Sequence, residues 1–149
     1  MGKRFQMTAT MRIGTAILRT LLRARLPLGP LALLSVRGRK TGNIYTTPVA
    51  LVKRDGQWWL VAAFGEVNWV RNLRASGAAS LIFQGRNETI NVIEVESVEA
   101  APVLKQFLMK FHIVPFIPPY FQTTPESPLD DFEREAPHHP VFRISGIRK

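Results

Sequence analysis

The 149-residue sequence contains no cysteine, which excludes disulfides, thiolate catalysis and thiolate metal sites together. It has only three histidines, and two of them, His138 and His139, are adjacent in a proline-flanked segment that we expect to lie in solvent. The sequence therefore predicts no metal centre. No apolar run reaches the roughly 18 residues that cross a bilayer. The charged N-terminal stretch has no small-residue cleavage site, so a cytoplasmic protein is expected.

Acidic residues are few beside basic ones. The chain has 11 Asp and Glu against 20 Lys and Arg, which gives a formal net charge of +9. Such a balance indicates an anionic partner: nucleic acid, an acidic membrane surface or a polyanionic small molecule. The hydrophobic share of 46% is ordinary for a soluble globular protein. The length predicts one domain over residues 1–149.

The N-terminal segment, residues 1–27, is predicted to carry an amphipathic helix from about Thr8 to Leu26. Ile13, Ile17, Leu21 and Leu22 recur at helical spacing, and arginines occupy the other flank. Two roles remain open at this point. The helix packs across a sheet and turns its charges to water, or it lies peripherally on the acidic inner face of a membrane.

The rest of the chain reads as short strands in tight hairpins with helices between them. The expected strands are Leu31–Val36, Tyr45–Val52, Gln57–Ala63, Ala79–Gln84, Glu88–Glu96 and Val141–Ile147. A short helix is expected after an N-cap at Asn68, and a longer one over Val98–Phe111. The proline-rich stretch from Ile113 to Pro140 reads as a covering loop with one helical turn. This order predicts a mainly β protein with added helices (α+β), an antiparallel barrel with packed helices.

A cationic glycine turn, Arg37-Gly38-Arg39-Lys40-Thr41-Gly42, joins the first two expected strands. Its charge and bare backbone N–H groups suit an anion such as phosphate. It is not the nucleotide-triphosphate loop, because that loop requires G-x-x-x-x-G-K-[ST] opening into a helix. An ordinary hairpin turn with solvated charges explains the spacing equally well.

The order of the motifs carries more information than any one of them. Gly38–Gly42 is followed by Thr47-Pro48, then Val61–Gly65, then Trp69-Val70-Arg71-Asn72-Leu73-Arg74-Ala75. From Leu31 to Leu81 this series resembles the deazaflavin (coenzyme F-420)-dependent nitroreductase family of split β-barrel proteins. The resemblance implies an oxidoreductase that uses reduced 8-hydroxy-5-deazaflavin coenzyme as hydride donor to an activated acceptor such as a quinone, enone or nitroaromatic.

The same resemblance implies which residues bind the coenzyme, a polyanion with a phosphodiester, a glutamate tail and an apolar ring system. The turn residues Arg39, Lys40, Thr41 and Gly42 would hold the phosphate and tail, Thr47, Pro48, Ala62, Ala63 and Phe64 would line the ring slot, and Trp69, Asn72 and Leu73 would close it. Tyr120 is the first candidate proton donor, with Tyr45 behind it.

Two positions depart from the family pattern. Ala63 stands where the family often has a serine, and Gly65-Glu66 stands in place of paired glycines. Glu66 therefore brings a negative charge close to a site for a polyanion.

Two alternatives stay open. A split barrel could instead bind flavin mononucleotide or haem through the same turn. A nonenzymatic basic protein binding nucleic acid or acidic lipid would explain the charge, but not the ordered motifs, so no specific nucleic-acid partner is expected. A homodimer is compatible with the fold, since open barrels commonly cover exposed strands with a second copy.

Overall fold

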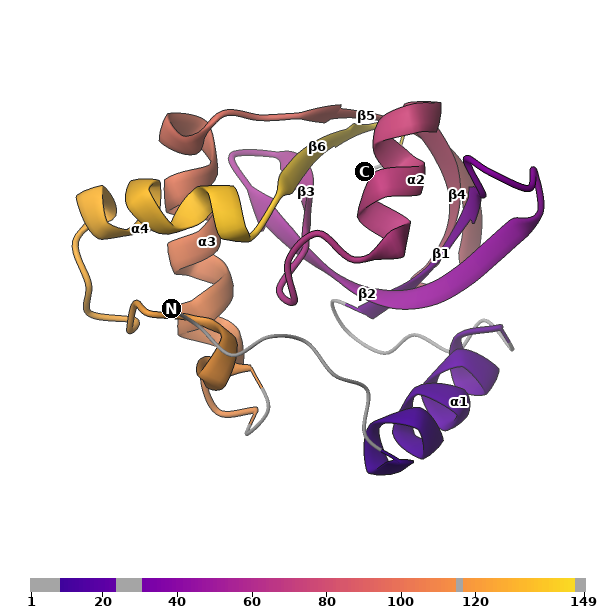
Figure 1. Ribbon diagram of the computed structural model, residues 1–149, viewed down its shortest axis with the longest axis horizontal. Helices are drawn as coiled ribbons and strands as arrows, with labels where there is room; N and C mark the ends of the chain where they lie inside the picture. The colour runs from indigo at the N-terminus through magenta and orange to yellow at the C-terminus, as the bar shows by residue number, and fades with distance from the viewer. Residues whose placement is uncertain (1–8, 24–30, 115–116, 147–149) are drawn as a thin grey trace.

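Six antiparallel strands close into a barrel in the order β1-β2-β3-β6-β5-β4 in the computed structural model, which describes residues 9–23, 31–114 and 117–146 (Figure 1). The strands are β1 Leu31–Arg37, β2 Ile44–Arg54, β3 Gln57–Val61, β4 Ala78–Phe83, β5 Arg86–Glu94 and β6 Val141–Ser145. The predicted antiparallel barrel is confirmed. Because β4 pairs with β1, the closed barrel leaves no open sheet edge for a second copy to cover.

The barrel interior is built by alternate residues of each strand. The buried side chains that meet there include Ala32, Leu34, Val36, Val49, Leu51, Leu60, Leu81, Phe83, Phe142 and Ile144. Since successive side chains of a strand point to opposite faces, this spacing of two is what the sequence pattern requires. Val70 and Leu73 of α2 (Asn68–Ser76) pack among them, so α2 covers one end of the barrel.

A second core lies outside the barrel wall, between β3, β6 and the helix α3 (Ser97–Phe111) (Figure 1). Trp59 and Val61 of β3 point outward into this core, whereas the neighbouring Trp58 packs toward the barrel interior. The two tryptophans face opposite ways because they are adjacent in one strand. The outer core also borders the cavity described below, because Val61 of β3 and Phe107 of α3 line that cavity.

Two hairpin turns depend on residues with positive φ. Asp55 and Gly56 have φ of 52° and 75°, and Gln84 and Gly85 have φ of 50° and 80°. Two consecutive left-handed residues are typical of the type I′ turn that matches strand twist. The first turn, Asp55-Gly56, has the Asp-Gly sequence that favours such a turn. The second lies at Gln84-Gly85, so β5 begins at Arg86 rather than at the predicted Glu88.

The helix α1 (Ala9–Arg23) lies against β1 and β2, and three apolar side chains of its stripe are exposed. Ile13 is 64% exposed, Ile17 57% and Leu21 37%. These three side chains are not packed against the sheet, as the first of the two roles would require. None of the described helices is both long and apolar enough to cross a membrane.

The segment expected to be a covering loop is more helical than predicted. It contains η1 (Pro118–Tyr120), α4 (Leu129–Glu135) and η2 (Ala136–His138), and α4 packs on α3. Phe132 anchors α4 with a fully buried ring. The apolar positions of this short helix are too few to reveal a period in the sequence. The predicted N-cap at Asn68 is also off by one residue, because Val67 holds that position and Asn68 begins α2.

Candidate functional site

A cavity of about 1020 Å³ opens between the β1–β2 turn, β2, the loop after β3, and the helices α2 and α3. Its size suits a small-molecule or cofactor site. The predicted binding residues that line it are Arg39, Lys40, Thr41, Thr47, Pro48, Ala63, Phe64, Trp69 and Asn72. Segments that are distant in sequence are therefore brought together around one cavity.

Three predicted residues lie outside this lining. Ala62 and Leu73 are buried in the barrel core at 1% and 0% exposure. Gly42 closes the turn in the left-handed conformation, with φ of 78° and its N–H donating to the Gly38 carbonyl. These three residues therefore support the segments that line the cavity and do not line it themselves.

The cationic turn is held by its own backbone and by α2. Asn72, only 5% exposed, accepts hydrogen bonds at Oδ1 from the Arg39 backbone N–H at 3.1 Å and from Arg39 Nη1 at 2.8 Å. The N–H groups of Gly38, Gly42 and Asn43 are likewise used within the turn. Among the described residues, the N–H groups of Lys40 and Thr41 are the ones in this turn left without an intramolecular partner. The expectation of a bare backbone is thus met at two positions only.

The rim of the turn carries a hydroxyl pair. Thr41 Oγ1 and the Tyr45 hydroxyl lie 3.2 Å apart, and both residues line the cavity. Gly38 is required beneath them, because a Cβ at this position would come within 2.5 Å of Tyr45 Cε2. Arg39, Lys40 and Thr41 of the turn and Tyr45 of β2 therefore place charged groups and two hydroxyls at this side of the cavity.

The far side of the cavity is apolar. It is formed by Phe107 and Phe111 of α3 with Val114 and Ile117 from the following segment. The two phenylalanine rings lie 4.7 Å apart. Phe107 and Phe111 are four residues apart on α3, a spacing that is also typical of core packing. No sequence signal distinguishes a core stripe from a stripe that also lines a cavity.

Tyr120 does not line the cavity. It is 7% exposed and contacts Phe64, a lining residue, edge-on at 4.9 Å between ring centres. The tyrosine that does line the cavity is Tyr45. Tyr120, the first candidate proton donor, therefore packs behind the cavity wall at Phe64, whereas Tyr45, the second candidate, lines the cavity itself.

The acidic residue Glu66 is paired away from the cationic turn. Its carboxylate is 2.9 Å from Arg74 Nη1, and Arg74 also binds both carboxylate oxygens of Glu94 at 2.7 Å. The hydrogen bond to Glu94 is the main cause of the raised pKa of Arg74, which stays charged. The negative charge of Glu66 is thus paired on another face, where Glu66, Arg74 and Glu94 line a second, smaller cavity.

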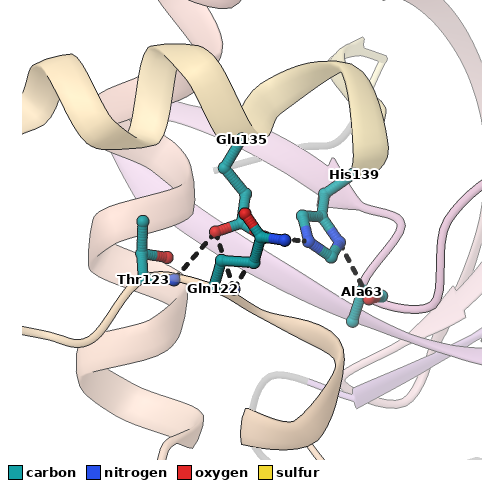
Figure 2. A network of polar contacts seen from close by, with 5 residues as sticks. All are labelled: Ala63, Gln122, Thr123, Glu135 and His139. Atoms are coloured by element: carbon teal, nitrogen blue, oxygen red, sulfur yellow. Dashed lines mark hydrogen bonds and ion pairs between the residues drawn. The ribbon is translucent and has the colours of Figure 1, made fainter. Parts of the chain in front are cut away.

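His139 is buried, contrary to the expectation that both adjacent histidines lie in solvent. His139 is 2% exposed and its ring bonds to Glu135 and to the carbonyl of Ala63 (Figure 2), whereas His138 is exposed. Nothing in the sequence marks the difference between the two, because only the tertiary fold brings residue 63 to residue 139. In the part of the chain that the structure describes, no three potential metal ligands gather in one place.

Comparisons with known proteins agree with this architecture. The sequence model of the family described as F420H(2)-dependent quinone reductase matches residues 4–110. No curated protein matches the chain.

Two solved structures of low identity share the fold. An F420-H2 dependent reductase, FDR-A, is 18% identical with a TM-score of 0.55, over 80% of this chain and 98% of that chain. A protein of unknown function from Agrobacterium tumefaciens, Atu2129, is 14% identical with a TM-score of 0.52, over 86% of this chain and 53% of that chain. The barrel is thus the split β-barrel that the motif order predicted.

Proposed function

The chain belongs to the F420H(2)-dependent quinone reductase family and is an F420-dependent oxidoreductase, and from this premise we propose that it reduces a quinone or a similarly flat, electron-poor acceptor in the cavity described above. When bound, reduced F420 supplies a hydride in one two-electron step. The observation that carries the proposal is the division of one cavity into a cationic, hydroxyl-bearing rim and an apolar far side.

The cationic rim fits the acidic part of the cofactor. Arg39 and Lys40 are exposed and line the cavity, and neither forms an ion pair among the described residues. Asn72 takes one Nη1 hydrogen of Arg39, which leaves most of the donors of its guanidinium for a phosphate. The N–H groups of Lys40 and Thr41 add two neutral donors to the same anion site.

The ring slot is proposed between two walls of the cavity. Thr47 and Pro48 of β2 form one wall, and Ala63 and Phe64 form the other. Pro48 lies within β2 and has no N–H, so the strand presents a smooth apolar surface at that point. Trp69 of α2 bounds the slot. Ala63 is a small residue on the second wall. Compared with the serine that the family often has there, it lacks a hydroxyl group for a polar contact, but it leaves the space of the slot open.

The acceptor is proposed to bind at the apolar side formed by Phe107, Phe111, Val114 and Ile117. Aromatic and aliphatic side chains favour a flat apolar guest, and they exclude water from the face where hydride arrives. Tyr45 lines the cavity at its rim, whereas Tyr120 does not line it, so Tyr45 is proposed to pass a proton to the reduced acceptor through water inside the cavity. Water entering at the rim is the other proton source.

The decisive experiment removes the two rim charges. The Arg39→Ala/Lys40→Ala variant should bind F420 about tenfold to a hundredfold more weakly, because each lost charge-assisted hydrogen bond contributes roughly 1.5 kcal/mol. Both residues lie in an exposed turn, so the melting temperature should stay within about 2 °C of the wild type. Fluorescence titration at two salt concentrations measures affinity and its electrostatic share, with flavin mononucleotide titrated in parallel.

A matched control removes equal charge elsewhere. Lys53→Ala/Lys110→Ala changes two exposed lysines that do not line the cavity, and it should leave F420 affinity unchanged. If the rim variant and this control bind F420 equally, the turn is not the phosphate site. If wild-type protein prefers flavin mononucleotide, the cofactor assignment itself fails.

The exposed stripe of α1 supports a second, separate proposal. Ile13, Ile17 and Leu21 face outward on a helix that contains no acidic residue and carries Arg12 and Arg19. Such a helix can rest on an acidic membrane surface with its apolar stripe inserted. We propose peripheral contact of this kind. A homodimer that buries the stripe is the alternative occupant, and sedimentation without lipid distinguishes it.

A further inference from the structure

A buried ion pair near the end of the chain has no part in the function proposed above. Glu135, the last residue of α4, is 6% exposed, and His139, four residues later, is 2% exposed. The Gln122 N–H donates to both carboxylate oxygens of Glu135, each at 3.0 Å. The Thr123 N–H donates to Glu135 Oε1 at 2.9 Å. His139 Nε2 lies 3.0 Å from the same carboxylate (Figure 2).

The second nitrogen of His139 reaches the cavity wall. Nδ1 lies 2.9 Å from the carbonyl oxygen of Ala63, and that oxygen can only accept, so Nδ1 donates. Burial alone would raise the pKa of Glu135, but hydrogen bonds from His139, Gln122 and Thr123 lower it to about 2. The ring of His139 is held between this carboxylate, 3.0 Å from Nε2, and the Ala63 carbonyl, to which Nδ1 donates (Figure 2).

The wall that this ring holds is Ala63–Phe64, one side of the proposed ring slot. Phe64 is supported in the same way by Tyr120, edge-on at 4.9 Å. The ring of Phe121 stacks flat on His139 at 3.9 Å and 6°. All three supporting residues lie beyond residues 4–110, the part that the family model matches. The segment after α3 therefore braces two consecutive residues of the slot from outside the cavity.

A peptide plane transmits the position of the carbonyl to the slot. The Ala63 carbonyl and the Phe64 N–H belong to one rigid trans unit and point in opposite directions. A donor fixed on the carbonyl thus fixes the direction of the whole plane. Without His139 this part-buried carbonyl would lose its donor, and the loop would be free to turn toward another one.

We propose that the Glu135–His139 pair is a positioning element that holds the Ala63–Phe64 peptide of the ring slot in the orientation that binds F420. The inference rests on the proposed function, because it takes Ala63 and Phe64 as the slot wall. Neither Glu135 nor His139 lines the cavity, so both act through Ala63 and not on the cofactor itself.

Two substitutions at one position separate the hydrogen bond from the packing. His139→Phe keeps a flat ring against Phe121 but has no donor, and His139→Asn keeps an N–H donor near the position of Nδ1. His139→Phe should raise the dissociation constant for F420 about tenfold, which corresponds to about 1.4 kcal/mol. His139→Asn should raise it about threefold or less, since the donor to Ala63 survives. His138→Asn, at the exposed neighbouring histidine, is the control and should bind as the wild type does.

The kinetic constants and the spectrum of the ring give readouts that a purely structural role would not move. The KM for F420H2 should rise with the dissociation constant, while the KM for the acceptor stays unchanged. In the protein without cofactor, nitrogen-15 NMR should show Nδ1 of His139 protonated, and His139→Phe should shift the Phe64 amide.

Each outcome decides between the two proposals. If His139→Phe binds F420 like the wild type while Arg39→Ala/Lys40→Ala binds weakly, the positioning role is overturned and the proposed function stands. If His139→Phe and His139→Asn weaken binding equally, the donor to Ala63 is not the cause and the inference also fails. If the rim variant has no effect, the proposed function fails first. Should His139→Phe not fold, an unprotonated Nδ1 of His139 in wild-type NMR would still overturn the inference.

Discussion

Asn72 offers the sharpest test of how the site is assembled. Its Oδ1 is the shared acceptor for the Arg39 backbone N–H at 3.1 Å and for Arg39 Nη1 at 2.8 Å. A net backbone hydrogen bond contributes about 1 kcal/mol, and one to a charged donor about 1.5–3 kcal/mol. Because Arg39 is exposed, water replaces much of the second bond. Asn72→Ala should therefore lower the free energy of unfolding by about 1.5–2 kcal/mol, or the melting temperature by about 5 °C.

The same substitution should weaken F420 binding roughly tenfold, because the turn is no longer held against α2 and must be ordered when the cofactor binds. Asn72→Asp is the informative partner. A carboxylate accepts both Arg39 donors, but it is a charge at a position only 5% exposed, so stability should lie between that of Asn72→Ala and that of the wild type. It also adds a negative charge beside the proposed acidic tail, which should weaken binding about fivefold, as a repulsion of about 1 kcal/mol requires.

Calorimetry for stability and fluorescence titration for affinity complete this test. Asn72→Ala with an unchanged melting temperature and unchanged F420 affinity would refute the bracing argument. Asn72→Asp binding F420 more tightly than the wild type would show that the acidic tail does not lie at this turn.

The remaining predictions concern acid stability, the membrane and the proton. The pKa of Glu135 falls from 4.5 to about 2 on folding, so its stabilisation is full above about pH 5 and lost as pH drops toward 2. When the free energy of unfolding is measured from pH 5 to pH 2, Glu135→Gln should lose about 3 kcal/mol less than the wild type. Replacing Ile13, Ile17 and Leu21 with serine should abolish flotation with acidic liposomes, and retained flotation would remove α1 from the membrane proposal. Tyr45→Phe should lower kcat at least about tenfold while F420 affinity holds, and unchanged turnover would assign the proton to water.

The short strands were predictable because they obey a local rule. Alternation of buried and solvent-facing residues and the Asp55-Gly56 turn are properties of a few neighbouring residues, so most strand bounds agree with the structure within two residues. The cationic turn was predictable for the same reason. Its order before Trp69 and Asn72 carried the resemblance that the family match confirms.

The tertiary structure decided everything that depends on what a residue meets across the fold. Phe107 and Phe111 fit a core stripe equally well whether or not a cavity opens beside them. The sequence predicted that Glu66 places a negative charge close to the anion site, but in the structure the Glu66 carboxylate is paired with Arg74. His138 and His139 are indistinguishable in sequence, yet one lies in solvent and the other bonds Ala63, 76 residues away. Local pattern fixes strands and turns because their physics is short-ranged, whereas partners brought together by barrel closure have no local signature.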